Sequence, residues 1–315
     1  MLKVGLIGVG GISGAHIPAW DAMKDAELVA LCDIRPEQME KYPDKRHYSA
    51  LEEMLEKESL DILDICLPTF LHVEYSIKAL EKGVNVICEK PVSLNKGDAK
   101  KIYSVAEKNN VKFMIAHVLR FWPEYELIKE LYENEKYGKL LSGSMSRLSN
   151  IPKWSWDGWM TDETRSGLVP YDLHIHDLDF LIYAFGKPNK ISGSREKRPE
   201  QDVLCALYDY GDFYVTAEAA WYNSPYPFTM KFRFQFEKAI VAWEKGVMKI
   251  YESEGRIFEV GSDSNTDTGN IDLPKSDAYA NEIRYFANCV INGRAPERVK
   301  ADELETVIEI LNDTF

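Results

Sequence analysis

Two histidines and three aspartates lie within nine residues of one another, in the segment Tyr171-Asp172-Leu173-His174-Ile175-His176-Asp177-Leu178-Asp179. The apolar residues that follow, as far as Gly186, predict a helix. At about 3.6 residues per turn, Asp172 and His176 share one face of that helix, whereas His174 lies roughly 200° around from His176. An imidazole with a pKa of about 6.5 takes up and releases a proton at neutral pH, and a carboxylate one turn away orients it. The pair therefore predicts an acid/base site that takes the proton of a hydroxyl group.

The same segment also contains the residue types of a metal site. On a helix, however, the i, i+2 spacing separates His174 from His176, and no cysteine lies nearby. A helix N-terminus that favours acidic residues through its dipole would account for Asp172 and Asp177, but not for His176. We therefore expect acid/base chemistry and no metal at this position.

A lysine follows another predicted element, in Cys88-Glu89-Lys90-Pro91. The apolar run Val84 to Cys88 predicts a buried parallel strand, and doubly wound sheets bind their ligands at the carboxyl ends of such strands. An ammonium group at that edge can stabilise an alkoxide as it forms. The alternative is a surface lysine before a proline that makes a turn, and both interpretations fit this motif.

A glycine-rich segment, Gly8-Val9-Gly10-Gly11-Ile12-Ser13-Gly14, follows the first apolar run and resembles the dinucleotide fingerprint, with Ser13 in place of the third glycine. The glycines allow a tight turn and close approach of a pyrophosphate, and the next helix offers free N–H groups. Asp33 ends the second predicted strand about 20 residues on, where a carboxylate binds the adenine ribose. We therefore predict a dinucleotide cofactor. Asp33 would repel a 2′-phosphate, which favours NAD, whereas Arg35 can bind that phosphate, so NADP stays possible.

The elements that carry these residues belong to two kinds of sheet. In the first part of the chain, short apolar and β-branched runs alternate with helical patterns, and such continuous runs are typical of parallel strands covered on both faces. An α/β fold with a doubly wound Rossmann sheet is therefore predicted for residues 1–118. The predicted strands are Val4 to Val9, Leu28 to Cys32, Ile62 to Pro68, Val84 to Cys88 and Val111 to Val118.

The pattern changes after residue 118. In the segment 230–236 every second side chain is apolar, which indicates a sheet with one face in water. Leu204 to Asp209 and Phe213 to Ala219 flank a Tyr210-Gly211-Asp212 turn and predict an antiparallel hairpin. Residues 119–315 are expected to form a second, α+β domain, in which the polar stretch Ser262 to Asn270 is a surface loop.

Composition narrows the class of partner. The chain has 315 residues, 38 Lys and Arg against 51 Asp and Glu, a net charge of −13 and no basic run, so we expect no nucleic acid partner. No stretch approaches the roughly 20 apolar residues that cross a bilayer, so we expect no membrane partner. The five cysteines show no paired spacing and no signal-peptide pattern precedes the first strand, so reduced thiols and a cytoplasmic location are expected.

In order and spacing, these motifs resemble the Gfo/Idh/MocA family of oxidoreductases. The resemblance covers nearly the whole chain, and no single motif carries it. It is carried by the glycine loop with His16, by Asp33, by Leu67-Pro68-Thr69 with His72, by Glu89-Lys90-Pro91, by Arg120-Phe121-Trp122-Pro123, and by the segment from Asp172 to Asp179.

The resemblance implies a C-terminal domain with a large, mostly antiparallel sheet that binds substrate and forms homodimers or homotetramers through its open face. It also implies a catalytic set of Lys90, Asp172 and His176, in which His176 is the acid/base, Lys90 polarises the reacting oxygen and Asp172 assists. Glu89 would lie near the nicotinamide. The remaining contacts that the resemblance implies are Leu67, Pro68, Thr69 and His72 at the cofactor and Arg120 at the substrate.

Two positions depart from the family pattern. Ser166-Gly167-Leu168-Val169-Pro170-Tyr171 stands where a glycine-rich run is common, and His174 stands where a small residue is common. Both concern the substrate. The nearby segment Trp154-Ser155-Trp156-Asp157-Gly158-Trp159 offers flat faces for sugar rings, with ordinary loop packing as the alternative, and we expect Trp159 and Tyr171 at the substrate.

The sequence thus predicts an NAD(P)-dependent dehydrogenase or reductase that moves a hydride between nicotinamide and a hydroxyl or keto group of a sugar or cyclic polyol. One alternative is an NAD-dependent glycoside hydrolase that oxidises its sugar transiently, and net NADH formation would separate the two. The other is a non-catalytic NAD-binding regulator, against which the presence of both Lys90 and His176 argues.

Overall fold

The computed structural model describes residues 1–260 and 276–315, so the expected loop from Ser262 to Asn270 lies outside the described residues. The contacts within the chain divide it into two units. Of the described residues, the first unit contains 1–118 and 277–305, and the second contains 119–260, 276 and 306–315. The division differs from the single boundary expected after residue 118, because helix α8 (Ala278–Ile291) packs against helix α1 (Ser13–Asp21) of the first unit.

The first unit is built on a six-stranded sheet in the order β3-β2-β1-β4-β5-β6, and all of its neighbouring strands are parallel. The five predicted strands are confirmed, although Cys66 to Pro68 lie beyond the end of β4. The additional strand, β3, has two exposed residues out of three and no apolar run that would reveal it. The strands are β1 (Leu2–Ile7), β2 (Ala26–Cys32), β3 (Arg46–Tyr48), β4 (Ile62–Ile65), β5 (Asn85–Glu89) and β6 (Phe113–Ala116).

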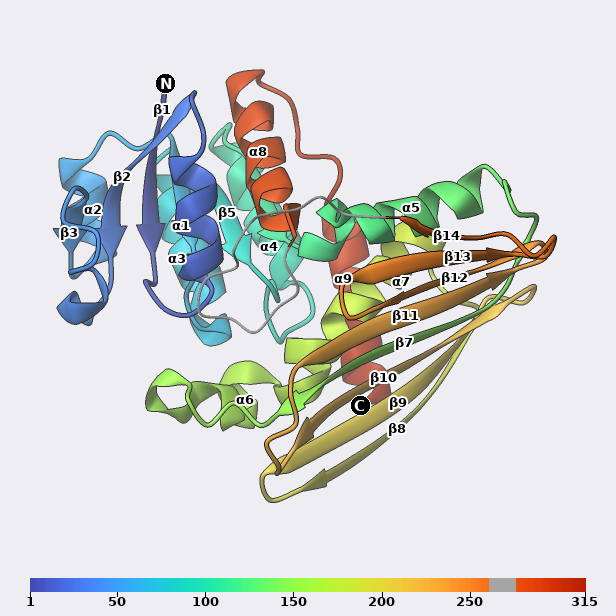
Figure 1. Ribbon diagram of the computed structural model, residues 1–315. Coiled ribbons are helices and arrows are strands. Elements are labelled where there is room, and N and C mark those ends of the chain that lie inside the picture. The colour runs from blue at the N-terminus through green and yellow to red at the C-terminus, as the bar shows by residue number, and fades with distance from the viewer. Residues whose placement is uncertain (261–275) are drawn as a thin grey trace. The chain divides into compact units, whose positions relative to one another are not determined.

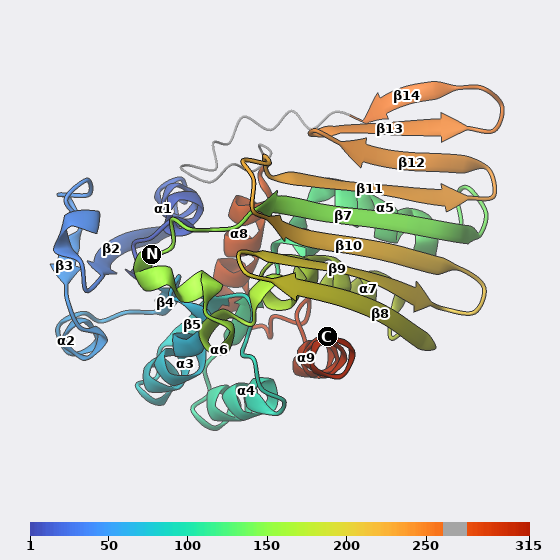
Figure 2. The same ribbon diagram turned by 90° about the horizontal axis from the view of Figure 1, so that it is seen from below.

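Helices cover both faces of this sheet, which confirms the doubly wound Rossmann fold. Helices α1 and α8 lie on one side, and α2 (Leu51–Lys57), α3 (His72–Glu81) and α4 (Asp98–Lys108) lie on the other (Figures 1 and 2). The last helix, α9 (Ala301–Thr314), begins in the first unit and continues into the second from Thr306. Because both faces are covered, β4 and β6 are buried along their whole length, as their continuous apolar runs predict.

The second unit is built on an eight-stranded sheet in the order β14-β13-β12-β11-β7-β10-β9-β8 (Figure 2). Strands β7 and β10 run parallel and every other neighbouring pair is antiparallel. The predicted hairpin is confirmed as β9 and β10, and the predicted alternation is confirmed in β11. The strands are β7 (Leu140–Asn150), β8 (Lys190–Arg198), β9 (Gln201–Asp209), β10 (Tyr214–Tyr222), β11 (Thr229–Phe236), β12 (Ala239–Glu244), β13 (Val247–Glu252) and β14 (Ile257–Val260).

Helices α5 (Pro123–Glu133) and α7 (Ile175–Phe185) cover one face of this second sheet. Edge-to-face aromatic contacts join them to it: the ring of Tyr125 in α5 lies 4.9 Å from that of Phe180 in α7 and 5.0 Å from that of Phe232 in β11. On the opposite face, alternate side chains of β9, β11 and β12 are exposed. The helix predicted to reach Gly186 is confirmed, but it is preceded by a π-helical turn, η5 (Pro170–His174), rather than beginning as an α-helix at Asp172.

Four of the cysteines are buried, Cys205 is exposed, and all five are free thiols. Among the described residues, no helix is both long and apolar enough to pass through a membrane.

Candidate functional site

The glycine loop has the geometry that a dinucleotide requires. Gly8 turns the chain with a φ of +92°, and a Cβ there would lie 2.5 Å from the carbonyl oxygen of Cys66, so the position accepts only glycine. A Cβ on Gly10 would meet nothing within 4 Å, so the space beside that backbone is open. Ser13, in place of the third glycine, donates a hydrogen bond from Oγ to the carbonyl oxygen of Gly10 at 2.7 Å. Helix α1 begins without a side-chain cap, and the N–H groups of Gly14 and Ala15 donate to the carbonyl oxygens of Gly11 and Ile12.

Asp33 ties the end of β2 to this loop. Its Oδ2 accepts a hydrogen bond from the Val9 N–H at 2.8 Å, and its Oδ1 accepts one from the Arg35 N–H at 2.8 Å and lies 3.3 Å from Arg35 Nε. A carboxylate has about four acceptor positions, so these contacts leave one on Oδ2 for a ribose hydroxyl. Asp33 and Arg35, which the sequence presents as competing determinants of the cofactor, are therefore paired with each other.

A buried chain of charged side chains links α1 to the ends of β4 and β5. Nδ1 of His16 lies 2.8 Å from Oδ2 of Asp64, and its Nε2 lies 3.0 Å from Oε1 of Glu89. The same Oδ2 of Asp64 accepts a hydrogen bond from Nε1 of Trp20 at 2.7 Å. Because both ring nitrogens face carboxylates, the His16 ring is doubly protonated and donates in both directions.

The pKa shifts agree with this geometry. Burial by itself lowers the pKa of His16, but the charge and hydrogen bond of Asp64, together with those of Cys66, outweigh burial and place the pKa well above its ordinary value. Burial by itself raises the pKa of Glu89, but the hydrogen bond and charge of His16, together with the charges of Lys90 and His72, outweigh burial and lower it. The chain is therefore an imidazolium between two carboxylates.

Sequence reasoning assigned His16 no role beyond the resemblance and did not identify Asp64. A signal was available, because a carboxylate inside the apolar run Ile62 to Ile65 needs a buried partner. Cys66 completes a group in which one ligand atom each of His16, Asp64 and Cys66 lies within 4.8 Å of the others. Hydrogen bonds account for this arrangement, and burial raises the pKa of Cys66 to about 12, which keeps it a thiol rather than a metal-binding thiolate.

Lys90 follows β5 and is half-buried. Its N–H donates to Oε2 of Glu89 at 3.1 Å, and its peptide bond to Pro91 is cis. The ring nitrogens of His72 lie 2.7 Å from the carbonyl oxygens of Leu67 and Pro91, so His72 connects the loop after β4 to the turn after Lys90. Thr69 is buried between these loops, and Leu67 and Pro68 are half-buried.

Asp172 and His176 differ from their neighbours in exposure. Of the ten residues from Tyr171 to Phe180, these two alone are partly exposed and the other eight are buried. The pattern supports the shared face expected for the pair, although the π-helical turn is wider than the α-helix on which that expectation was based. His174 lies on the other side and is fully buried, with Nε2 at 2.6 Å from Oη of Tyr208. Burial, helped by Arg147, lowers the pKa of His174 to about 3, so its ring is neutral.

Three residues expected at the substrate have contacts inside the second unit. The Arg120 side chain is fully buried, and its Nε and Nη2 donate to the two carboxylate oxygens of Asp179 at 2.9 and 2.6 Å. Tyr171 is buried, with its ring so close that a Cβ on Gly167 would lie 2.4 Å from it. Trp159 packs on an apolar cluster formed by Met160, Leu168, Val169, Leu173, Leu204, Ala219 and Trp221.

Arg120 neutralises a buried carboxylate, and Trp159 is partly exposed while it packs on this cluster. The exposed tryptophans of that loop are Trp154, at 71% exposure, and Trp156, at 39%. Hydrophobic pattern could not distinguish the three, because each follows a polar or small residue in a loop without periodicity.

Comparisons with known proteins agree with this architecture. A model of an oxidoreductase family with an NAD-binding Rossmann fold matches residues 2–117, and a model of the GFO/IDH/MocA C-terminal domain matches residues 125–242. Glucose-6-phosphate 3-dehydrogenase of Bacillus subtilis is 27% identical over 226 residues, which cover 68% of this chain and 64% of the relative. Myo-inositol 2-dehydrogenase of Thermotoga maritima is 28% identical over 191 residues, which cover 59% of this chain and 55% of the relative. The matched region is thus less than two thirds of either relative.

Among solved structures, a levoglucosan dehydrogenase in complex with NADH and levoglucosan has a TM-score of 0.82, with 99% of this chain and 95% of that chain covered at 18% identity. An oxidoreductase of Agrobacterium radiobacter in complex with NAD+, L-tartaric acid and magnesium has a TM-score of 0.84, with 99% and 96% covered at 19% identity. At such identities the likeness concerns the fold. Since family models match both the Rossmann sheet and the larger sheet, the chain belongs to the Gfo/Idh/MocA family of oxidoreductases and carries its NAD-binding Rossmann domain.

Proposed function

We propose that the protein is an NAD-dependent dehydrogenase, with NADP as a possible second cofactor, that transfers a hydride between nicotinamide and a hydroxyl or keto carbon of a sugar or cyclic polyol. The observation that carries the proposal is the partial exposure of Asp172 and His176 in an otherwise buried segment. The exposure leaves the imidazole and the carboxylate accessible to a substrate, whereas the other side chains from Tyr171 to Phe180 are buried. The names of the relatives, a sugar phosphate dehydrogenase and an inositol dehydrogenase, favour the substrate class.

The proposed chemistry gives each side chain one task. A bound nicotinamide supplies or accepts the hydride. His176 takes the hydroxyl proton during oxidation and returns it during reduction, and Asp172 orients the imidazole or the substrate. The ammonium group of Lys90 stabilises negative charge on the reacting oxygen. Glu89, whose pKa is lowered by the hydrogen bond from His16, stays ionised and holds the N–H of Lys90.

The proposed cofactor contacts begin at the glycine loop, where the open space beside Gly10 and the uncapped start of α1 fit a pyrophosphate. Asp33 would accept one ribose hydroxyl on Oδ2. A 2′-phosphate would meet the Asp33 carboxylate together with the Arg35 side chain that is paired with it. Because Arg35 already neutralises the Asp33 carboxylate, the 2′-phosphate of NADP is repelled less than it would be by a lone aspartate. We therefore expect a preference for NAD rather than an absolute requirement.

The test is absorbance of reduced nicotinamide while the purified chain, with NAD or NADP, is given a panel of sugars, inositols, sugar acids and glycosides. A rise with one compound identifies the substrate. His176→Ala should then abolish turnover and leave the Kd for NAD nearly unchanged, whereas His47→Ala, which changes an exposed histidine of the first unit, should keep both. Normal turnover in His176→Ala would refute the assignment. Cleavage of a glycoside without net NADH would replace the dehydrogenase by a glycoside hydrolase.

We also propose that the protein is a homodimer or homotetramer formed through the open face of the larger sheet. Large apolar side chains are exposed on strands of that sheet, among them Leu207, Tyr214, Ile240 and Tyr251. A sheet face of this kind is an aggregation hazard unless a partner covers it. Light scattering at micromolar concentration should give the mass of two or four chains, and the mass of one chain would contradict the proposal.

A further inference from the structure

We propose that Asp202 and Tyr208, both on β9, are positioning residues that hold the two ends of the π-helical turn Pro170–His174 and thereby set the placement of Asp172 and His176. The inference rests on the proposed function of that pair. It concerns residues of the second unit only, and the sequence assigned neither Asp202 nor Tyr208 a role at the site.

Strand β9 turns one row of side chains toward the interior: Asp202, Leu204, Ala206 and Tyr208 are buried, and the residues between them are exposed or half-buried. The middle of the row is apolar and both ends are polar. A polar group at a buried position must have a hydrogen-bond partner to avoid its desolvation cost. Asp202 and Tyr208 each have a hydrogen-bond partner in the segment Val169 to His174.

The first contact stands at the start of the π-helical turn. Gly167 and Leu168 both have left-handed backbone, with φ of +72° and +58°. This conformation is unfavourable for a leucine and persists only where the surroundings impose it. The N–H of Leu168 itself donates to Oγ of Ser166 at 3.0 Å. The N–H of the next residue, Val169, donates to Oδ2 of Asp202 at 3.1 Å. The strained residue is thus held between two hydrogen bonds.

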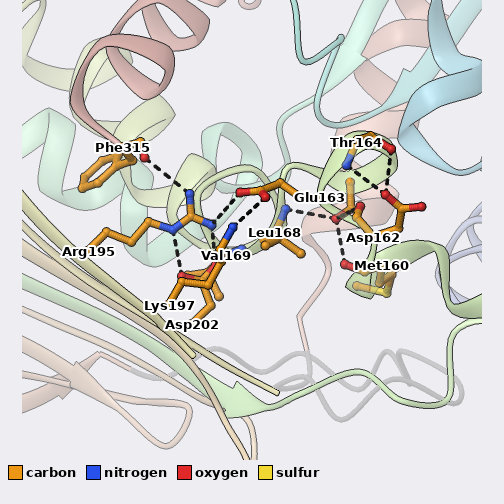
Figure 3. A network of polar contacts seen from close by, with 11 residues as sticks. Met160, Asp162, Glu163, Thr164, Leu168, Val169, Arg195, Lys197, Asp202 and Phe315 are labelled. Atoms are coloured by element: carbon orange, nitrogen blue, oxygen red, sulfur yellow. Dashed lines mark hydrogen bonds and ion pairs between the residues drawn. The ribbon is translucent and has the colours of Figure 1, made fainter. Parts of the chain in front are cut away.

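Asp202 is itself fixed by a guanidinium group. Arg195 on β8 donates from Nε to Oδ1 at 2.8 Å and from Nη2 to Oδ2 at 2.7 Å, a two-point contact that allows one orientation of the carboxylate. Nη1 of Arg195 lies 3.5 Å from the carbonyl oxygen of Phe315. Figure 3 shows Arg195 between Phe315 and Asp202, with the Val169 N–H directed at the same carboxylate. The contact therefore joins β8, β9 and the start of the turn.

The second contact stands at the end of the turn. Nε2 of His174 lies 2.6 Å from Oη of Tyr208, and both side chains are buried. Because the pKa of His174 is about 3, its ring stays neutral over the pH range in which His176 would exchange a proton. The contact thus keeps one hydrogen-bonding pattern while the proposed acid/base titrates.

The two contacts enclose Asp172, and His176 follows the second by two residues. Leu173 in the turn and Leu204, which lies between Asp202 and Tyr208 on β9, also belong to one buried apolar cluster. A displacement of either end would move the carboxylate and the imidazole relative to each other, and misplacement by about 1 Å can cost a reaction roughly 100-fold.

The experiment compares two variants with two matched controls in the full chain. Asp202→Asn keeps the shape but cannot accept both guanidinium bonds, and Tyr208→Phe removes one hydroxyl. The controls are Arg198→Gln and Tyr210→Phe. The first breaks an exposed ion pair with Glu196 on β8, the strand that carries Arg195, and the second removes a hydroxyl that lies 3.2 Å from the Gly186 carbonyl oxygen and 3.4 Å from that of Leu181. With a substrate from the panel, each variant should lose about 10- to 100-fold in kcat with KM and the Kd for NAD within about threefold of wild type. Each control should match wild type.

A second measurement needs no substrate. The chain has six histidines, and the ring proton resonance of His176 is identified by its loss in His176→Ala. Tyr208→Phe and Asp202→Asn should both shift the pKa read from that resonance, because the distance to Asp172 changes, while the controls leave it unchanged. Unchanged kcat and an unchanged His176 pKa in a folded Tyr208→Phe would overturn the inference. If His176→Ala kept its turnover while Tyr208→Phe shifted the His176 pKa, the proposed function would fail and the positioning would stand.

Discussion

Replacing His16 by glutamine tests whether the buried chain Asp64-His16-Glu89 is held together by charge. The substitution keeps hydrogen-bonding capacity but removes the positive charge between two carboxylates that are both buried. Removing one partner of a buried ion pair costs about 3–5 kcal/mol. At roughly 2–4 °C per kcal/mol for a unit of this size, the first unit should lose about 6–20 °C in Tm near pH 7.

The pH dependence of that loss is the sharper test. In the wild type, the folded pKa of His16 lies above the unfolded value of about 6.5, so its stabilisation is complete below that pH and is lost as the pH rises through the folded pKa, by at most about 1.4 kcal/mol per pH unit. In His16→Gln, one of the two carboxyl groups should have a pKa above its unfolded value of about 4 and should gain stability as the pH falls. The stability difference should therefore be largest near neutral pH and smaller on both sides.

The measurement is urea unfolding followed by the indole N–H resonance of Trp20, which donates to Asp64 and is the only tryptophan among residues 1–118. This resonance reports on the first unit alone. His47→Gln is the control, because His47 is exposed and its Nε2 lies 2.9 Å from the Tyr42 carbonyl oxygen rather than from a buried carboxylate. Equal stability of His16→Gln and wild type at neutral pH, or a difference that stays constant from about pH 5 to about pH 9, would refute the charged chain.

Two further predictions concern single carboxylates. Asp33→Ala should weaken the binding of NAD by about 10-fold or more, because a charge-assisted hydrogen bond is lost and the Val9 N–H loses its acceptor. The substitution should also narrow the preference for NAD over NADP, measured as the ratio of the two Kd values in calorimetric titrations, and an unchanged ratio would contradict the prediction. Asp179→Asn should lower the free energy of unfolding of the second unit in urea by about 3–5 kcal/mol, because it leaves the buried Arg120 guanidinium without its counter-charge. Asp157→Asn, which changes an exposed pair with Arg165, should lower it little, and similar effects of the two substitutions would show that burial does not set the cost.

Most of the first sheet and strands β9, β10 and β11 of the second were predictable, because the burial of a strand shows in the pattern of its apolar residues. Continuous apolar runs such as Val84 to Cys88 indicated strands covered on both faces, and the strict alternation of β11 indicated one covered face. Strand β3 was not predicted, because it has only three residues, two of them exposed, and so shows no apolar run. The sequence did not predict that α8 belongs to the first unit. An amphipathic pattern shows that a helix has a buried face, but it does not show which sheet that face covers.

The candidate site divides in the same way. The sequence by itself indicated three features of the candidate site. They are the tight turn at Gly8, the position of Asp33 about 20 residues after the glycine loop, and a shared helix face for Asp172 and His176. Tertiary structure alone decided that His16 bridges carboxylates 48 and 73 positions away, that Arg120 faces Asp179, and that a strained turn is held by β9. The physical reason is the distance along the chain over which each interaction acts. Periodicity shows which side of one element avoids water, and it depends only on neighbouring residues. The partner of a buried charge is fixed only when distant segments of the chain meet in the fold.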